Sequence, residues 1–210
     1  DQDFLALRPL YMRDDSLSAE DVLARIPPDL GGERLTWNGV DLQELKLTGV
    51  DLHRALLKRA DLDNADLADA KLAGAYLLSA TLHKASLQRA DLRFASLARA
   101  YLREADLTDA RMNRCRLNDA NLRGAILEKA SLARADLRGA DLRDARLAEA
   151  DLTGARLTDA VLTGADLTGA RVNDKAWLTK HAALVGDEWQ LCKDAAGYVI
   201  ESKRRRCPTP

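Results

Sequence analysis

Large apolar residues recur at every fifth position through the middle of this chain. The 27 positions from Leu42 to Val172 are all Leu except Met112 and Val172 itself. A second series lies two residues before the first, and between residues 55 and 170 it is Ala at every step except Cys115. Not one insertion breaks the register, so the period of five has to be explained by the fold.

A period of five fits neither of the common regular structures. A β-strand alternates its faces with a period of two, so a five-residue step would switch face each time. On an α-helix five residues turn by about 500°, which would spread the leucines around every side. A chain that turns a corner every five residues does fit, because four such sides close a square coil of twenty residues with Leu and Ala pointing inward.

The sequence therefore predicts an all-β solenoid, a quadrilateral parallel β-helix of about seven coils, over residues 35–173. Coils would stack at the strand spacing of about 4.8 Å, which gives a rod roughly 32 Å long. Glycines recur at one fixed corner position, where they permit positive φ. These are Gly49, Gly74, Gly124, Gly139, Gly154, Gly164 and Gly169.

The two ends of the chain lie outside the repeat and are interpreted as caps. Residues 1–34 carry a short predicted helix that Pro27-Pro28 ends. Residues 174–210 predict a helix to about residue 185, then a hairpin from Glu188–Cys192 and Tyr198–Ser202, then a basic tail. Covering the open ends of stacked strands prevents aggregation. Trp37 is expected to plug a wider first coil.

Strings such as Ala60-Asp61-Leu62-Asp63-Asn64 and Ala165-Asp166-Leu167-Thr168-Gly169 resemble the pentapeptide-repeat family. The resemblance covers roughly residues 40–173. It implies that the β-helix is right-handed. It also implies one function to consider, because the best-known members of the family mimic DNA and protect type II topoisomerases (gyrase) against quinolones or toxins.

No set of residues predicts catalysis, a cofactor or a metal site. His53, His83 and His181 are far apart in the coil map, and no Ser-His-Asp pattern connects them. Asp is frequent just before Leu, where Asp and Asn are expected to bond neighbouring backbone at the corner. The chain contains no apolar run long enough to cross a membrane. We therefore expect a non-catalytic protein.

The coil register predicts which outward side chains stack, because residues twenty apart lie above one another. It places Leu56, Tyr76 and Leu78 on one side of the first coils, where polar residues would be ordinary. Such apolar groups mark contact surfaces. The alternative is that the N-terminal segment folds back over them.

Arginines form the second outward feature. Arg103, Arg123 and Arg143 stack in one column, and further arginines gather near Phe94. The candidate partner surface consists of Leu56, Tyr76, Leu78, Phe94, Arg103, Arg123 and Arg143. The alternative for the arginines is an ordinary mixed-charge face.

Cys192 and Cys207 flank the C-terminal segment and would form a disulfide in an oxidising compartment, or else remain two unrelated thiols. Cys115 occupies an Ala position and is interpreted as a core residue. With the missing initiator Met, the cysteines favour a periplasmic or secreted protein, with a cytoplasmic one as the alternative. We expect a monomer or a dimer formed through a cap.

Three functions from different classes remain. A DNA mimic needs an acidic rod, yet residues 41–173 hold 20 Asp and Glu against 21 Lys and Arg. Direct nucleic-acid binding lacks net positive charge and has few aromatic platforms. The sequence favours the third, a scaffold or protein-binding module that docks an unidentified protein through one side or one cap.

Overall fold

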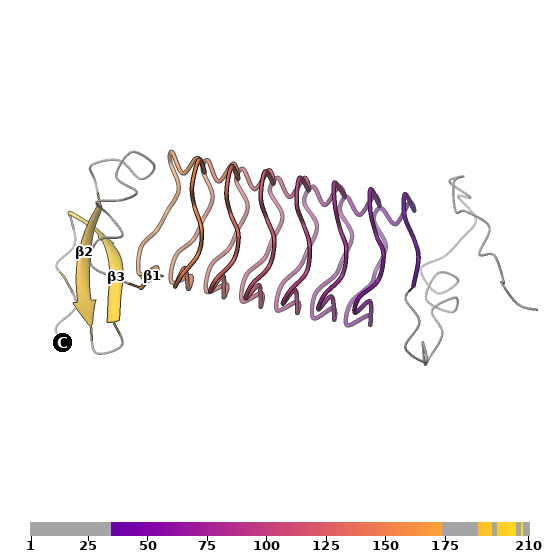
Figure 1. The fold of residues 1–210 in the computed structure, drawn as a ribbon, viewed down its shortest axis with the longest axis horizontal. Helices are drawn as coiled ribbons and strands as arrows, with labels where there is room; N and C mark the ends of the chain where they lie inside the picture. Colours follow the sequence, from indigo (N-terminus) through magenta and orange to yellow (C-terminus); the bar gives the residue numbers. More distant parts are fainter. Residues whose placement is uncertain (1–34, 174–188, 195–196, 205–206, 208–210) are drawn as a thin grey trace, which may run out of the picture.

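The computed structural model describes residues 35–173, 189–194, 197–204 and 207. The expected N-terminal cap (1–34) and the expected helix after residue 173 lie outside these residues. Within the described residues the chain is all-β and contains no helix. Figure 1 shows a rod of stacked coils with a small sheet at its C-terminal end.

Each coil is held to the next by parallel β-bridges between residues twenty apart, from Thr36↔Leu56 to Asp151↔Arg171. The bridges recur every five residues, so each twenty-residue coil has four sides and four turns. The predicted period and register are confirmed.

The five-residue repeats inside the stack use their backbone in the same way, as the repeat from Asp61 to Ala65 illustrates. The bridge residue Asp61 donates its N–H to Val40 of the preceding coil at 2.8 Å, and the inward Leu62 donates to Thr81 of the next at 2.9 Å. Asp63 and Asn64 are the first and second turn residues. Ala65 closes the turn by donating to the carbonyl of Leu62 at 3.1 Å.

The second turn residue has a positive φ in all repeats from residue 39 to residue 169. A single positive φ at the third position of a four-residue turn is the pattern of a type II turn. Glycine tolerates it best, which confirms the predicted role of the corner glycines. Nineteen of the repeats nevertheless place a side chain other than glycine there.

The core is the stack of inward Leu and Ala side chains, and the leucines at every fifth position from Leu42 to Leu152 are fully buried. Burying one Leu side chain contributes roughly 1.5–3 kcal/mol, so this column supplies most of the hydrophobic stabilisation. Trp37 occupies a Leu position in the first coil and is buried there, as expected. Its indole N–H has no hydrogen-bond partner among the residues that the structure describes.

A three-stranded antiparallel sheet, in the order β1-β3-β2, closes the C-terminal end of the rod. Its strands are β1 (Arg171–Val172), β2 (Trp189–Asp194) and β3 (Gly197–Ser202). β1 belongs to the last coil. The hairpin predicted for this region is present, and its strands extend further into the turn, because Lys193↔Tyr198 and Asp194↔Gly197 also pair.

The hairpin joins the coil edge through backbone bonds. Gly169 donates to the carbonyl of Ile200 at 2.7 Å, and Ile200 donates to Ala170 at 2.9 Å. Ile200 and Val199 are buried, and Ile200 belongs to the same core as the leucines. The hairpin therefore covers backbone groups that would otherwise form an open edge.

Candidate docking surface

The frequent Asp before Leu has a structural role at the corners. The first turn residue has the one backbone N–H of the repeat that finds no backbone acceptor, and Asp supplies one: Asp61 Oδ1 accepts from Asp63 N–H at 3.2 Å. The same bond forms at all ten Asp bridge positions of the rod and at Asn121. The structure thus confirms the backbone-bonding interpretation of these carboxylates.

Three of these Asp residues also hold an arginine two positions later. Arg93, Arg138 and Arg143 each donate two side-chain hydrogen bonds to the Asp two residues before. The guanidinium bond holds the pKa of each carboxyl below its ordinary value. The sequence signal for this pair is Asp-Leu-Arg.

The four sides of the rod are named here by one bridge residue each. The Leu56 face carries the bridge column from Thr36 through Leu56 to Arg156, and the Asp141 face the column from Asp41 to Val161. The Asp106 face carries Lys46 to Asp166, and the Arg111 face Asp51 to Arg171. Each face includes the two turn residues that follow each bridge residue.

Apolar side chains gather on the Leu56 face, as the register predicted. Leu56 and Tyr76 are bridge partners in adjacent coils, and Leu78 is the first turn residue after Tyr76. The side chain of Tyr76 is 43% exposed, whereas Leu56 and Leu78 are half-buried. Together they form an apolar cluster, called here the Leu56 cluster, on the outside of the rod.

Phe94 lies at the edge that the Leu56 face shares with the Arg111 face, and its side chain is 60% exposed. Residue 114 stacks one coil further on, and the Arg114 guanidinium carbon lies 5.7 Å from the centroid of the Phe94 ring. A cation over an aromatic ring at this distance is an attractive contact. It fixes an arginine beside the apolar cluster.

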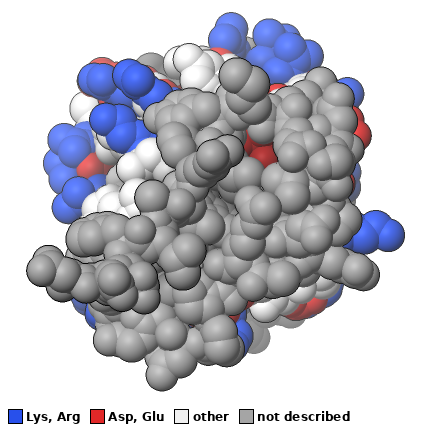
Figure 2. Space-filling view, turned by 90° about the vertical axis from the view of Figure 1, so that its right-hand side faces the viewer, with Lys and Arg blue, Asp and Glu red and all other residues white. Residues whose placement is uncertain are grey.

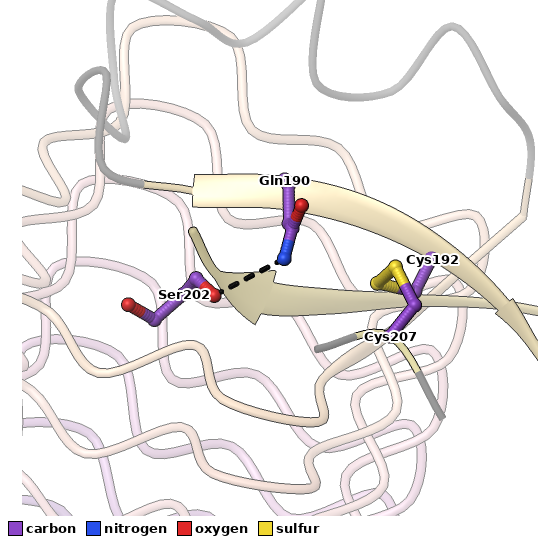
Figure 3. Close-up of a disulfide and its surroundings, with 4 residues drawn as sticks. All are labelled: Gln190, Cys192, Ser202 and Cys207. Carbon is purple, nitrogen blue, oxygen red and sulfur yellow. Dashed lines mark hydrogen bonds between the residues drawn. A yellow bond between two sulfur atoms is a disulfide. The ribbon is translucent and has the colours of Figure 1, made fainter. Parts of the chain in front are cut away.

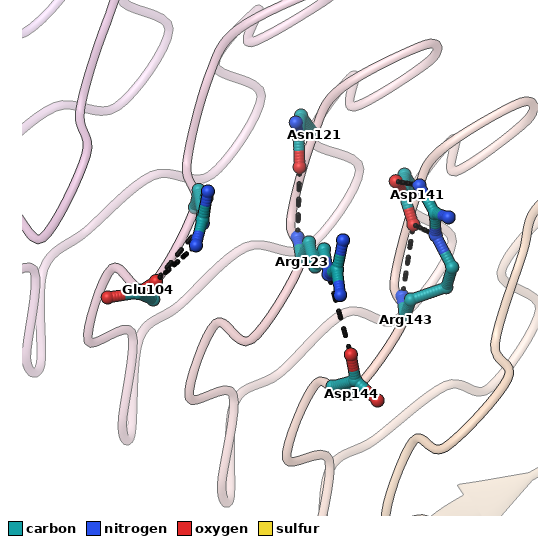
Figure 4. A network of polar contacts seen from close by, with 7 residues as sticks. Glu104, Asn121, Arg123, Asp141, Arg143 and Asp144 are labelled. Carbon is teal, nitrogen blue, oxygen red and sulfur yellow. Dashed lines mark hydrogen bonds and ion pairs between the residues drawn. The ribbon is translucent and has the colours of Figure 1, made fainter.

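The column of Arg103, Arg123 and Arg143 lies on the Asp141 face, and each of its cations is ion-paired. Arg103 pairs with Glu104 at 3.0 Å, Arg123 with Asp144 at 3.4 Å, and Arg143 with Asp141. Figure 4 shows the carboxylates interleaved with the arginines along this face. The column is therefore a mixed-charge surface, which distinguishes it from the apolar cluster on the Leu56 face.

Sequence analysis missed the cations around the Leu56 cluster. Arg54, Lys58 and Arg59 surround Leu56, and of the described residues none offers any of them a carboxylate at ion-pair distance. A map of charge on each face, built from the twenty-residue stacking, would have revealed them.

Cys192 and Cys207 are joined as a disulfide, with Cα atoms 5.3 Å apart. Figure 3 shows this bond beside the hairpin, where Gln190 Nε2 also donates to the Ser202 carbonyl at 3.2 Å. Cys115 is a free thiol in the core, and burial raises its pKa to about 12. A thiol of that kind is not a nucleophile.

The described residues contain neither a metal-ligand group nor a membrane-spanning helix. They contain no group of three or more His, Cys, Asp and Glu placed to hold a metal ion. Nor do they include any helix of the length and apolarity that a membrane crossing requires. His53 contacts Asp51, and His83 contacts the Arg103 carbonyl, so both histidines have local partners.

The sequence profile described as "Pentapeptide repeats" matches the chain in eight copies, over residues 38–72, 60–93, 85–124, 115–154 and 140–174. These segments cover well over half of the chain. The chain belongs to the pentapeptide repeat family. The pentapeptide repeats coincide with the stacked coils, and the family is generally non-catalytic.

Solved pentapeptide repeat structures are similar to the chain. HetL from Nostoc sp. strain PCC 7120, involved in heterocyst differentiation regulation, is 30% identical over 66% of this chain and 79% of that one, with a TM-score of 0.29. Rfr23 from Cyanothece 51142 is 27% identical over 69% of this chain and 92% of the Rfr23 chain, with a TM-score of 0.24.

Two further solved structures match at lower sequence identity. QnrB1, a plasmid-mediated fluoroquinolone resistance protein, is 21% identical over 74% of this chain and 93% of the QnrB1 chain, with a TM-score of 0.43. A pentapeptide repeat protein from the Arabidopsis thaliana thylakoid lumen is 19% identical over 75% of this chain and 82% of its own, with a TM-score of 0.35. None of the curated proteins compared with the chain matches it.

Proposed function

We propose that this chain is a non-catalytic protein-binding rod, a right-handed four-sided β-helix that docks a protein partner through the Leu56 face. The observation that carries the proposal is the Leu56 cluster. Leu56, Tyr76 and Leu78 stand at outward positions where the repeat elsewhere uses mainly polar or charged residues. Grouped apolar side chains on a surface commonly mark a contact site.

The composition of this face also supports a protein interface. Tyr, Phe and Arg are the residue types enriched at the centres of interfaces, and Tyr76, Phe94 and Arg114 lie together here. A rod of stacked repeats presents such side chains on a rigid backbone, which lowers the entropic cost of binding.

The DNA-mimic alternative finds less support. The Asp141 and Asp106 faces carry fourteen Asp and Glu but also eight Lys and Arg. Several of these cations neutralise their neighbours, as Arg123 does for Asp144 and Arg146 for Glu128. A mimic of the phosphate backbone needs negative charge without such interruption, so we do not extend gyrase protection to this chain.

A matched pair of substitutions tests the docking proposal. Leu56→Asp and Ile126→Asp each replace a half-buried bridge residue, the first on the Leu56 face and the second on the opposite Asp106 face. Both variants should fold, because Asp is the commonest bridge residue of the repeat. Circular dichroism and thermal melting check this.

Partners captured by the immobilised wild-type protein are identified by mass spectrometry, purified, and titrated against each variant. Leu56→Asp should weaken binding at least about tenfold, whereas Ile126→Asp should leave it unchanged. Leu78→Asp should repeat the loss. Equal effects of Leu56→Asp and Ile126→Asp would refute the proposal.

A further inference from the structure

Although the pentapeptide repeats are almost neutral, their charge is divided between two sides of the rod. The outward positions of the Leu56 and Arg111 faces, which adjoin, carry thirteen Lys and Arg and six Asp and Glu. The outward positions of the Asp141 and Asp106 faces carry eight Lys and Arg and fourteen Asp and Glu. In the end-on view of Figure 2, Lys and Arg side chains gather along the left and upper-left margin.

The positive charge is most one-sided around the Leu56 cluster. From residue 36 to residue 99, the outward positions of the Leu56 face hold Lys58, Arg59 and Arg99 and not one Asp or Glu. Arg54 and Arg114 add two cations at the shared edge. Of these five, only Arg99 has an ion pair among the described residues, at 3.9 Å to Asp119.

We infer that the Leu56 face binds an acidic protein segment that carries apolar side chains between its carboxylates. The inference rests on the proposed function and adds the chemistry of the partner. Guanidinium groups bind carboxylates through two parallel hydrogen bonds, and within the described part of the chain Arg54, Arg59 and Arg114 make no such bond to a carboxylate. The Leu56 cluster between them accepts the apolar side chains.

Surplus charge also steers an acidic partner toward this face. Oppositely charged surfaces raise association rates, and this effect weakens as salt is added. The acidic half of the rod repels the same partner, so the two halves together fix which side it approaches. The near-zero net charge of the repeats conceals this selectivity.

Two other anionic partners fit the face less well. A membrane surface favours a broad row of exposed apolar side chains, whereas in the Leu56 cluster only Tyr76 is exposed and Leu56 and Leu78 are half-buried. Single-stranded nucleic acid gains affinity by stacking its bases on exposed aromatic rings, and Arg114 already lies over the ring of Phe94.

The test measures binding of defined probes to the full-length protein by fluorescence anisotropy at low and moderate salt. The main probe is a synthetic peptide that alternates Glu with Leu and Tyr. Matched peptides replace Glu by Lys, or Leu and Tyr by Ser. Single-stranded DNA and phosphatidylserine vesicles are the competing anionic probes.

The Glu-Leu-Tyr peptide should bind, and binding should weaken with salt. The Lys peptide should not bind, and the Ser peptide should bind at least about tenfold more weakly, because it lacks the apolar contacts. Tighter binding of DNA or of the vesicles, or no binding of the Glu-Leu-Tyr peptide, would overturn the inference.

Charge reversal supplies the matched variants. Arg59, Arg114 and Lys129 all occupy second turn positions, where Glu44, Glu104 and Glu149 show that Glu is tolerated. The double variant Arg59→Glu/Arg114→Glu should lower affinity for the Glu-Leu-Tyr peptide at least about tenfold. Lys129→Glu, on the Asp106 face, should leave it unchanged, and an equal loss would contradict the inference.

Two results separate this inference from its premise. If a natural partner is lost with Leu56→Asp but retained by Arg59→Glu/Arg114→Glu, the docking site holds and the acidic-partner inference fails. If neither substitution affects the partner, both fail. Carbodiimide cross-links from Lys58 to carboxylates within residues 1–33 would show that this chain itself occupies the face, which also overturns the inference.

Discussion

At the scale of single residues, the bridge position explains why Asp and Asn are so frequent in this repeat. Their side-chain oxygen accepts the one backbone N–H that the coil leaves without a backbone acceptor. Where the bridge residue is not Asp or Asn, a side chain twenty residues earlier can replace it, as Asn38 does for Lys58 and Asp63 for His83.

Asp151→Ala tests this role, because Asp151 Oδ1 accepts from Thr153 N–H at 2.9 Å and Asp151 forms no ion pair with any described residue. We expect the free energy of unfolding to fall by about 0.5–1.5 kcal/mol, measured by denaturant titration. Asp151→Asn keeps the acceptor and should stay close to the wild type. An equal loss in both variants would mean that charge, not the acceptor, is what matters.

Cys115 gives a second prediction at this scale. Because burial raises the pKa of its thiol to about 12 and excludes reagents, it should not react with Ellman's reagent near neutral pH while the protein is folded. With the disulfide intact, unfolding in denaturant should release one reactive thiol per chain. One thiol already reactive in the native protein would show that the coil opens around residue 115.

The residue scale also shows what the sequence could and could not predict. Period and residue size sufficed to place the inward Leu and Ala positions, since only one path turns a corner every five residues. The positive φ of residues such as Arg59 and Phe94 was not evident from their type, because most side chains disfavour it. There the coil geometry overrides local preference.

At the scale of elements, the hairpin is the part that departs from the repeat. Its alternating pattern predicted two strands, but no sequence signal indicated that β3 would pair with β1 of the last coil. That pairing depends on contacts between residues far apart in the sequence. It places the Arg171–Val172 side of the last coil between the preceding coil and β3, so that this side is not an open edge.

Ile200→Asp should release this cap, because Ile200 is fully buried against the core. We expect the last coil to expose its edge and the protein to self-associate, as seen by light scattering. Lys193→Asp, at an exposed position of β2, is the control and should remain unassociated. A variant Ile200→Asp as soluble as the control would show that the hairpin does not protect the edge.

At the scale of the whole molecule, function depends on how side chains are distributed around the rod and not on its net charge or overall composition. A neutral composition argued against both an acidic mimic and a basic nucleic-acid binder. The distribution over the four faces adds to this, because one side carries an apolar cluster next to cations that have no carboxylate partner among the described residues. The inward Leu and Ala columns do not depend on which side chains that face carries, so they hold no information about the partner.

Photo-cross-linking compares the two sides most directly. Tyr76 and Val161 are exposed bridge residues, 43% and 41% accessible, on the Leu56 face and the Asp141 face. Each is replaced in turn by benzoylphenylalanine, and the protein is irradiated in an extract of the cells that make it. Position 76 should yield an adduct with a discrete protein that Leu78→Asp abolishes, and position 161 should yield none. Adducts from position 161 alone, or equally from both positions, would contradict docking through the Leu56 face.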